Sequence, residues 1–167
     1  EDFNLDLMHG LPGQTQDDAL ADLDAAIALA PTHISWYELT IEPNTAFFNA
    51  PPARPDEETL ADIEDAGLEH LADAGYERYE VSAFARPGRA CRHNRNYWRF
   101  GDYLALGAGA HGKLSFPAED RILRYWKTRQ PEHYLNAIGS RTLGRRELDR
   151  DERPLEFLLN ALRLVEG

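Results

Sequence analysis

A strand, a helix and a second strand follow one another within the first 41 residues, and this order constrains the fold more than any other feature. Residues 3–8 alternate in the manner of a strand, and β-branched and aromatic residues are frequent in 34–41. Thr15 and Asp18 have the spacing of a capping box, which predicts a helix that Pro31 ends. The two strands are therefore predicted to be parallel neighbours joined by a right-handed crossover.

The same α/β pattern continues to residue 84. Four prolines interrupt 42–55, so a long connecting loop is expected there. Asp56 is expected to begin a second helix that Gly75 ends, and 78–84 is predicted to be a third parallel strand. Three parallel strands leave an open edge that a barrel normally closes. The chain is thus expected to be an incomplete piece of an α/β barrel.

The second half of the chain has a different character. Segment 91–100 is polar and aromatic with no clear period, and 103–111 is a run of small residues. A further strand is expected at 121–126, and helices are expected at 131–138 and 153–165. The last helix carries an apolar stripe that needs a partner.

Charge and composition exclude several classes of function. The net charge of −11 argues against nucleic acid as a partner, and no apolar run approaches the ~20 residues of a membrane span. The single cysteine, Cys91, can form neither an internal disulfide nor a thiolate metal site, which fits a reducing compartment such as the cytoplasm. Five arginines gather in one segment: Arg86, Arg89, Arg92, Arg95 and Arg99. They either bind an anion such as a carboxylate or belong to a solvated loop.

Polar residues fall at the expected carboxyl ends of the three strands, where sites form in parallel α/β folds. These residues are Asp6, Met8 and His9, then Glu38, Thr40 and Glu42, which alternation would place on one face, then Glu80 and Ser82. Polar side chains on the inner face of a barrel are costly unless they bind something. A ligand site is therefore favoured over a structural role.

His93 and Tyr97 lie four residues apart among aromatic residues and arginines. Both are potential haem-iron ligands, aromatic rings can cover a flat macrocycle, and arginines can pair with propionates. The alternative for His93 is a hydrogen-bonded structural histidine. The glycine-rich run 107–112 either packs against a planar ring or marks a close backbone crossing, and it does not match the dinucleotide fingerprint.

Five segments together resemble one known family. The chain is similar to the oxygen-independent coproporphyrinogen III oxidase family of radical SAM proteins, and within it to the HemW haem-chaperone branch. The segments that carry the resemblance are 4–15, 35–45, 79–85, 96–103 and 107–113.

The resemblance implies a (β/α)6-type partial TIM barrel, of which residues 1–112 would be the C-terminal half and 113–167 the start of a C-terminal helical domain. It implies a [4Fe-4S] cluster and S-adenosylmethionine in the full-length protein. Asp6, Thr40 and His111 match positions that contact S-adenosylmethionine in the family. The family has alanine and isoleucine at the last two, so a backbone role is implied there.

His93, Asn94 and Tyr97 match the HNxxY motif associated with haem binding in the HemW branch. The implied function is haem or porphyrin binding and delivery to haem-accepting proteins in the cytoplasm, and a homodimer is left open. The alternative is a coproporphyrinogen III oxidase of porphyrin biosynthesis. The family holds its cluster with a CxxxCxxC motif, whereas this chain has only Cys91, so the chain itself is expected to hold no cluster and to be inactive as an enzyme.

Overall fold

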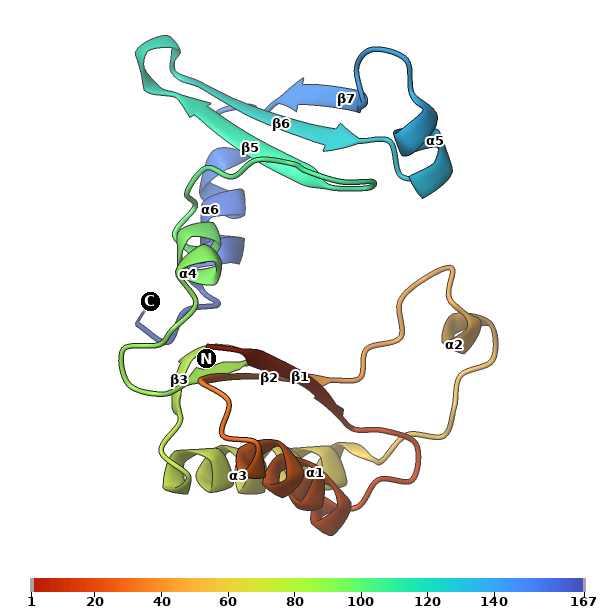
Figure 1. The fold of residues 1–167 in the computed structure, drawn as a ribbon, viewed down its shortest axis with the longest axis vertical. Coiled ribbons are helices and arrows are strands. Elements are labelled where there is room, and N and C mark those ends of the chain that lie inside the picture. The colour runs from red at the N-terminus through yellow and green to blue at the C-terminus, as the bar shows by residue number, and fades with distance from the viewer. Residues whose placement is uncertain (1, 167) are drawn as a thin grey trace. The chain divides into compact units, whose positions relative to one another are not determined.

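A computed structural model gives the fold of residues 2–166. Within these residues the chain divides into two compact units, the first ending at Cys91 and the second spanning Arg92–Val165 (Figure 1). The predicted division at residue 112 concerns the barrel of a longer protein and stays a prediction.

The first unit begins with the predicted strand–helix–strand arrangement. Strand β1 (Asn4–His9) pairs in parallel with β2 (His33–Glu38), and helix α1 (Gln16–Ala28) connects them. The capping box is formed in both directions, with the Asp18 amide donating to Thr15 Oγ1 at 3.2 Å and the Thr15 amide donating to Asp18 Oδ2 at 2.9 Å. The prediction for this segment is confirmed.

A second helix, α3 (Glu57–Asp73), lies beside α1 on one face of the sheet (Figure 1). Asp56 caps it as predicted, while the loop before it holds a one-turn helix, α2 (Ala46–Asn49), that the prolines did not predict. A Cβ at Gly67 would lie 2.0 Å from the Trp36 ring, so glycine lets α3 pack directly on the indole. The buried core includes Leu23, Ile34, Trp36, Ile63, Leu71 and Phe84.

The predicted third strand is wrong in its form and direction. Residues 78–84 do not form one strand but contribute to two, β3 (Glu77–Glu80) and β4 (Ala83–Ala85), and β4 is antiparallel to both β2 and β3 in a sheet of order β1-β2-β4-β3. The reason is a turn between them, where the Glu80 carboxylate accepts a hydrogen bond from the Ser82 amide at 3.1 Å. Alternation along a strand cannot reveal such a turn.

Strand β2 is also shorter than predicted. It ends at Glu38, so Thr40 and Glu42 do not continue its face. The chain instead bends, with Thr40 Oγ1 donating to Glu42 Oε1 at 3.2 Å and Arg54 donating to the Leu39 carbonyl at 2.8 Å. The prediction that alternation aligns Glu38, Thr40 and Glu42 is therefore wrong.

The second unit is built on an antiparallel sheet of order β5-β6-β7. The predicted strand at 121–126 and the two predicted helices are present, although the last helix ends at Ala161. Helix α4 and strands β5 and β7 were not predicted. The elements are α4 (Arg92–Trp98), β5 (His111–Phe116), the 3-10 turn Pro117–Glu119, β6 (Arg121–Lys127), α5 (Pro131–Asn136), β7 (Thr142–Glu147) and α6 (Arg153–Ala161).

Two glycines face aromatic rings across this sheet. Gly112 on β5 is the direct partner of Tyr125, and Gly144 on β7 is the direct partner of Trp126. An added Cβ would lie 2.4 Å from the Tyr125 ring at the first glycine and 2.2 Å from the Trp126 ring at the second. Each ring therefore covers a glycine on a neighbouring strand.

A buried lysine fixes the segment before β5. Lys113 is 1% exposed, and its ammonium donates to the Phe100 carbonyl at 2.7 Å, to Asp102 Oδ1 at 3.1 Å and to Ser115 Oγ at 3.0 Å. Burial tends to raise the pKa of Asp102, but hydrogen bonds from Ser115 and the charge of Lys113 hold it below its ordinary value. All three ammonium protons are thus paired.

Candidate functional site

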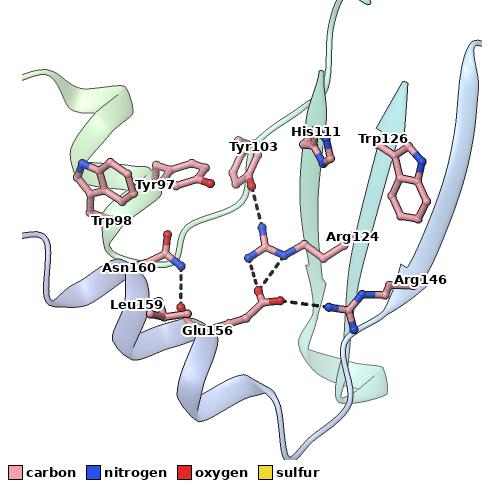
Figure 2. Close-up of a pocket in the computed structure, with 10 residues that line it drawn as sticks. All are labelled: Tyr97, Trp98, Tyr103, His111, Arg124, Trp126, Arg146, Glu156, Leu159 and Asn160. Atoms are coloured by element: carbon pink, nitrogen blue, oxygen red, sulfur yellow. Dashed lines mark hydrogen bonds and ion pairs between the residues drawn. The ribbon is translucent and has the colours of Figure 1, made fainter. Parts of the chain in front are cut away.

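A cavity of about 570 Å³ lies within the second unit (Figure 2). Its volume is in the range of small-molecule sites. Aromatic rings, two arginines and one glutamate line it, and they come from α4, α6, the sheet and the segment before β5. The lining residues are Tyr97, Trp98, Tyr103, His111, Arg124, Trp126, Arg146, Glu156, Leu159 and Asn160.

One face of the sheet supplies the floor of the cavity. His111 and Trp126 are direct partners across β5 and β6, with their rings stacked at 6.4 Å and 26°. Arg124 lies two residues before Trp126 on β6, so alternation places both on the same face. Arg146 on β7 is the direct partner of Arg124. The floor therefore carries two rings and two guanidinium groups.

The carboxylate of Glu156 on α6 contacts both arginines (Figure 2). Arg124 donates to it twice, with the Nε bond at 3.0 Å, and Nη2 of Arg146 lies 3.5 Å from it. Arg146 also donates to Glu152 at 2.6 Å, and this hydrogen bond raises the pKa of Arg146. The cavity therefore contains a charged cluster that is already internally paired.

Tyrosines connect this cluster to α4. Arg124 donates to the Tyr103 hydroxyl at 2.7 Å, and the Tyr103 ring lies 4.8 Å from that of Tyr97. Burial, followed by a hydrogen bond with Tyr97, raises the pKa of Tyr103 to about 12. Trp98 packs edge-on against Tyr97 at 4.7 Å, and its buried indole nitrogen has no hydrogen-bond partner among residues 2–166.

The predicted haem motif lies on α4. His93 and Tyr97 are one helical turn apart and therefore share a face of this helix, with Asn94 next to the histidine. His93 is exposed, whereas Tyr97 is half-buried and lines the cavity. The structure thus brings the motif together, but only Tyr97 of its three members borders the cavity.

Sequence reasoning did not find the rest of the cavity. Its floor follows from the pairing of β6 with two strands that were not predicted, and only the alternation of Arg124 and Trp126 in 121–126 was a visible signal. Residues of the cavity that were not singled out as candidates are Trp98, Tyr103, Arg124, Trp126, Arg146, Glu156, Leu159 and Asn160.

The residues predicted to contact S-adenosylmethionine fall in both units. Asp6 is exposed on β1 and accepts a hydrogen bond from Asn4 Nδ2 at 2.8 Å. Thr40 is exposed just beyond β2. His111 begins β5 and borders the cavity of the second unit. Their assignment to a common ligand stays a prediction.

A network of hydrogen bonds crosses the sheet on the same face as Asp6. Asn4 Oδ1 lies 2.6 Å from His33 Nδ1 and accepts from Ser35 Oγ at 3.2 Å, while His33 Nε2 lies 2.7 Å from the Tyr79 hydroxyl. Burial lowers the pKa of His33, which favours the neutral ring. Because the Asn4 oxygen can only accept, the ring proton belongs on Nδ1. These hydrogen bonds orient the Asn4 amide so that its Nδ2 donates to Asp6.

His9 lies on the opposite face of β1 from Asp6, because strand alternation separates them. It is 5% exposed, and its ring packs at a tilt of 35° against Trp36 with the centroids 4.1 Å apart. It borders a cavity of about 200 Å³ together with Glu38 and Glu64. Burial lowers the pKa of His9. His9 Nδ1 and the Trp36 indole nitrogen have no hydrogen-bond partner within the described part of the chain.

The five arginines of segment 86–99 fall into two groups: two make structural contacts and three line a cavity. Arg86 packs over the Tyr76 ring at 4.1 Å, and Arg89 pairs with Asp2 at 3.0 Å. The other three arginines, together with Asn96 and Gly101, line a cavity of about 430 Å³.

Residues 2–166 contain no group of three or more His, Cys, Asp or Glu side chains arranged to hold a metal ion. No helix of that same stretch is long and apolar enough to cross a membrane.

Comparison with known proteins identifies the sequence group. No protein-family model matches the chain. It is 52% identical over 165 residues to the heme chaperone HemW of Escherichia coli and 54% identical over 165 residues to that of Haemophilus influenzae, with 99% of this chain covered each time. Its sequence places this chain within the HemW family. The chain spans 43% and 42% of the length of these two relatives.

A solved structure supports the fold. The radical SAM enzyme coproporphyrinogen III oxidase, HemN, from Escherichia coli matches 96% of this chain with a TM-score of 0.74 and 18% sequence identity. The match covers 40% of the HemN chain. The predicted fold class, part of a radical SAM α/β fold, is thereby confirmed.

Proposed function

We propose that this chain carries the haem-binding site of a HemW-type haem chaperone, a protein that binds haem and passes it to haem-accepting proteins. The observation that carries this proposal is the position of the HNxxY motif. His93 and Tyr97 share one face of α4, and Tyr97 borders an aromatic cavity. The high identity to proteins named heme chaperones supports the same function.

The residues present fit haem as a ligand. Imidazole and phenolate are both known iron ligands, and the exposed His93 is accessible to a large flat molecule. Aromatic rings suit the faces of a macrocycle, and the buried Trp98 indole N–H beside them has no hydrogen-bond partner among residues 2–166. Arginines in the same cavity suit carboxylates.

A hemin titration of this chain, followed by its absorption spectrum, tests the proposal. We expect the His93→Ala and Tyr97→Phe variants to alter the Soret band and to weaken binding about tenfold or more, since each removes an iron ligand. His133→Ala is a matched control, because His133 is an exposed histidine of the same unit on α5. Spectra unchanged by both motif variants would remove this motif as the iron-binding site.

The family also implies S-adenosylmethionine and a [4Fe-4S] cluster in the full-length protein. One cysteine cannot hold such a cluster, so the residues of this chain do not fit it. We propose Asp6 as a contact to S-adenosylmethionine, since its carboxylate is exposed and oriented by Asn4, and Thr40 and His111 as further contacts. In the full-length protein, Asp6→Asn should weaken S-adenosylmethionine binding in a calorimetric titration, and unchanged binding would exclude this role.

The alternative activity is that of a coproporphyrinogen III oxidase. It is suggested by the structural similarity to HemN, which at 18% identity supports the fold alone. Formation of protoporphyrinogen by the full-length protein with S-adenosylmethionine and a reductant would favour the oxidase. The haem acceptor, a homodimer and a cytoplasmic location stay predictions.

A further inference from the structure

Two arginines stand directly opposite each other on adjacent strands of the cavity floor. Arg124 on β6 and Arg146 on β7 are register partners. Like charges directly opposite in a sheet destabilise it, so this pair requires an anion close by. The arrangement is typical of a site that receives a carboxylate.

Glu156 is the anion that contacts both guanidinium groups from outside the sheet, while Glu152 binds Arg146 alone at 2.6 Å. Glu156 extends from α6 toward both guanidinium groups, as Figure 2 shows, and is the acidic residue among those lining the cavity. Its side chain is 22% exposed, against 20% for Arg124 and 48% for Arg146. The carboxylate is therefore tightly held on the Arg124 side and accessible on the Arg146 side.

Aromatic surfaces flank the same two arginines. The Trp126 ring lies on the same face of β6 as Arg124, and the Tyr103 hydroxyl accepts a hydrogen bond from Arg124. A flat ring system that carries carboxylates would meet rings and guanidinium groups at once in this cavity. Acidic ligands without a ring system would use only the arginines.

We propose that the Arg124–Arg146 pair is the carboxylate subsite for a porphyrin, and that Glu156 is its exchangeable internal occupant. The inference rests on the proposed haem function and deepens it. A propionate that binds Nη2 of Arg146 displaces the 3.5 Å contact of this guanidinium with Glu156. Glu152 stays on Nη1 of Arg146, and Glu156 stays paired with Arg124. Competition by Glu156 keeps binding reversible, as transfer of a bound porphyrin to another protein requires.

Metal-free protoporphyrin IX and its dimethyl ester test the subsite, because both lack iron and only the first has charged carboxylates. Binding to this chain is followed by porphyrin fluorescence. We expect the diacid to bind about tenfold more tightly than the diester, and Arg146→Gln to abolish this difference. Arg145→Gln is the matched control, since Arg145 carries the same charge on the opposite face of β7 and is not among the residues that line this cavity. Equal binding of diacid and diester by the unmodified chain would overturn the proposal.

Substitution of Glu156 tests the competition. Glu156→Gln should tighten diacid binding about tenfold and leave diester binding unchanged, because it removes the competing carboxylate. Glu147→Gln, on the face of β7 away from the cavity, should change neither. If circular dichroism shows that the amide variant is unfolded, Glu156→Asp, which shortens the acid, should tighten diacid binding to a smaller extent. Weaker or unchanged diacid binding by a folded Glu156 variant would refute the exchange.

Failure of this inference is distinguishable from failure of the proposed function. The porphyrin ligands lack iron, so their binding does not depend on His93 or Tyr97 as iron ligands. A hemin spectrum that responds to His93→Ala, together with diacid binding indifferent to Arg146→Gln, would retain the haem site and reject the subsite.

Discussion

Removal of the Asp102 carboxylate should destabilise the second unit more than most surface substitutions do. In Asp102→Asn the Lys113 ammonium, whose side chain is 2% exposed, keeps only neutral acceptors. Breaking a buried ion pair from one side costs about 3–5 kcal/mol. Because the Asp102 side chain is 41% exposed and water screens part of its charge, we expect a loss of about 2 kcal/mol in the free energy of unfolding.

A double-mutant cycle isolates this interaction. In a Lys113→Met background, the Asp102→Asn change should cost less than about 1 kcal/mol, since no buried charge is then left unpaired. Hydrogen exchange measured by mass spectrometry on peptides covering β5 and β6 reports the opening free energy of this unit alone. A coupling energy below about 0.5 kcal/mol would refute the reasoning.

The pH dependence gives an independent check. The pKa of Asp102 is lowered in the folded state from an ordinary value of 3.8, so the unfolded chain binds its proton first as the pH falls. The stability that Asp102 contributes is therefore full well above pH 3.8 and is lost as the pH falls toward the lower folded pKa. The difference between the unmodified chain and Asp102→Asn should shrink over that interval and stay constant near neutrality.

Three further outcomes are expected. Thr15→Ala should lower the stability of the first unit by about 1 kcal/mol in urea unfolding, because it removes the cap that Asp18 reciprocates. Gly67→Ala should lower it by about 1–3 kcal/mol, because the added methyl group would lie 2.0 Å from the Trp36 ring, and a neutral result would mean that α3 can shift. In an ultraviolet titration, the difference between the unmodified chain and Tyr103→Phe should contain a phenol that ionises near pH 12 rather than 10.

The elements that the sequence predicted well are those with local determinants. The helix after Thr15 and the helix after Asp56 have side-chain caps that are visible as single residues, and both were formed as expected. The parallel pairing of β1 and β2 followed from the length of the crossover between them. The caps depend on neighbours within a few residues, and the parallel pairing depends on the order of the elements along the chain.

The elements that were missed depend on distant partners. The strand predicted at 78–84 is interrupted because a carboxylate within it, that of Glu80, caps a turn, and its pairing with β2 is antiparallel. Helix α4 has no apolar period, and it packs through two adjacent aromatic residues, with Tyr97 against Tyr103 and Trp98 under Arg163. The motif at His93 was visible, but the cavity beside it results from strand pairing that no local pattern encodes.

The two glycines opposite Tyr125 and Trp126 determine how β6 can align with its neighbours. The two rings point to opposite faces of β6, and each has its glycine on a different adjacent strand. If β6 shifted by one residue relative to β5 and β7, each ring would face a side chain instead of a glycine. Trp126 and Arg124 would then point away from the cavity. Gly144 has no side chain with which to contact a ligand, yet a methyl group there would displace the Trp126 indole and so change the floor of the cavity. Part of the binding surface is thus encoded by the absence of a side chain.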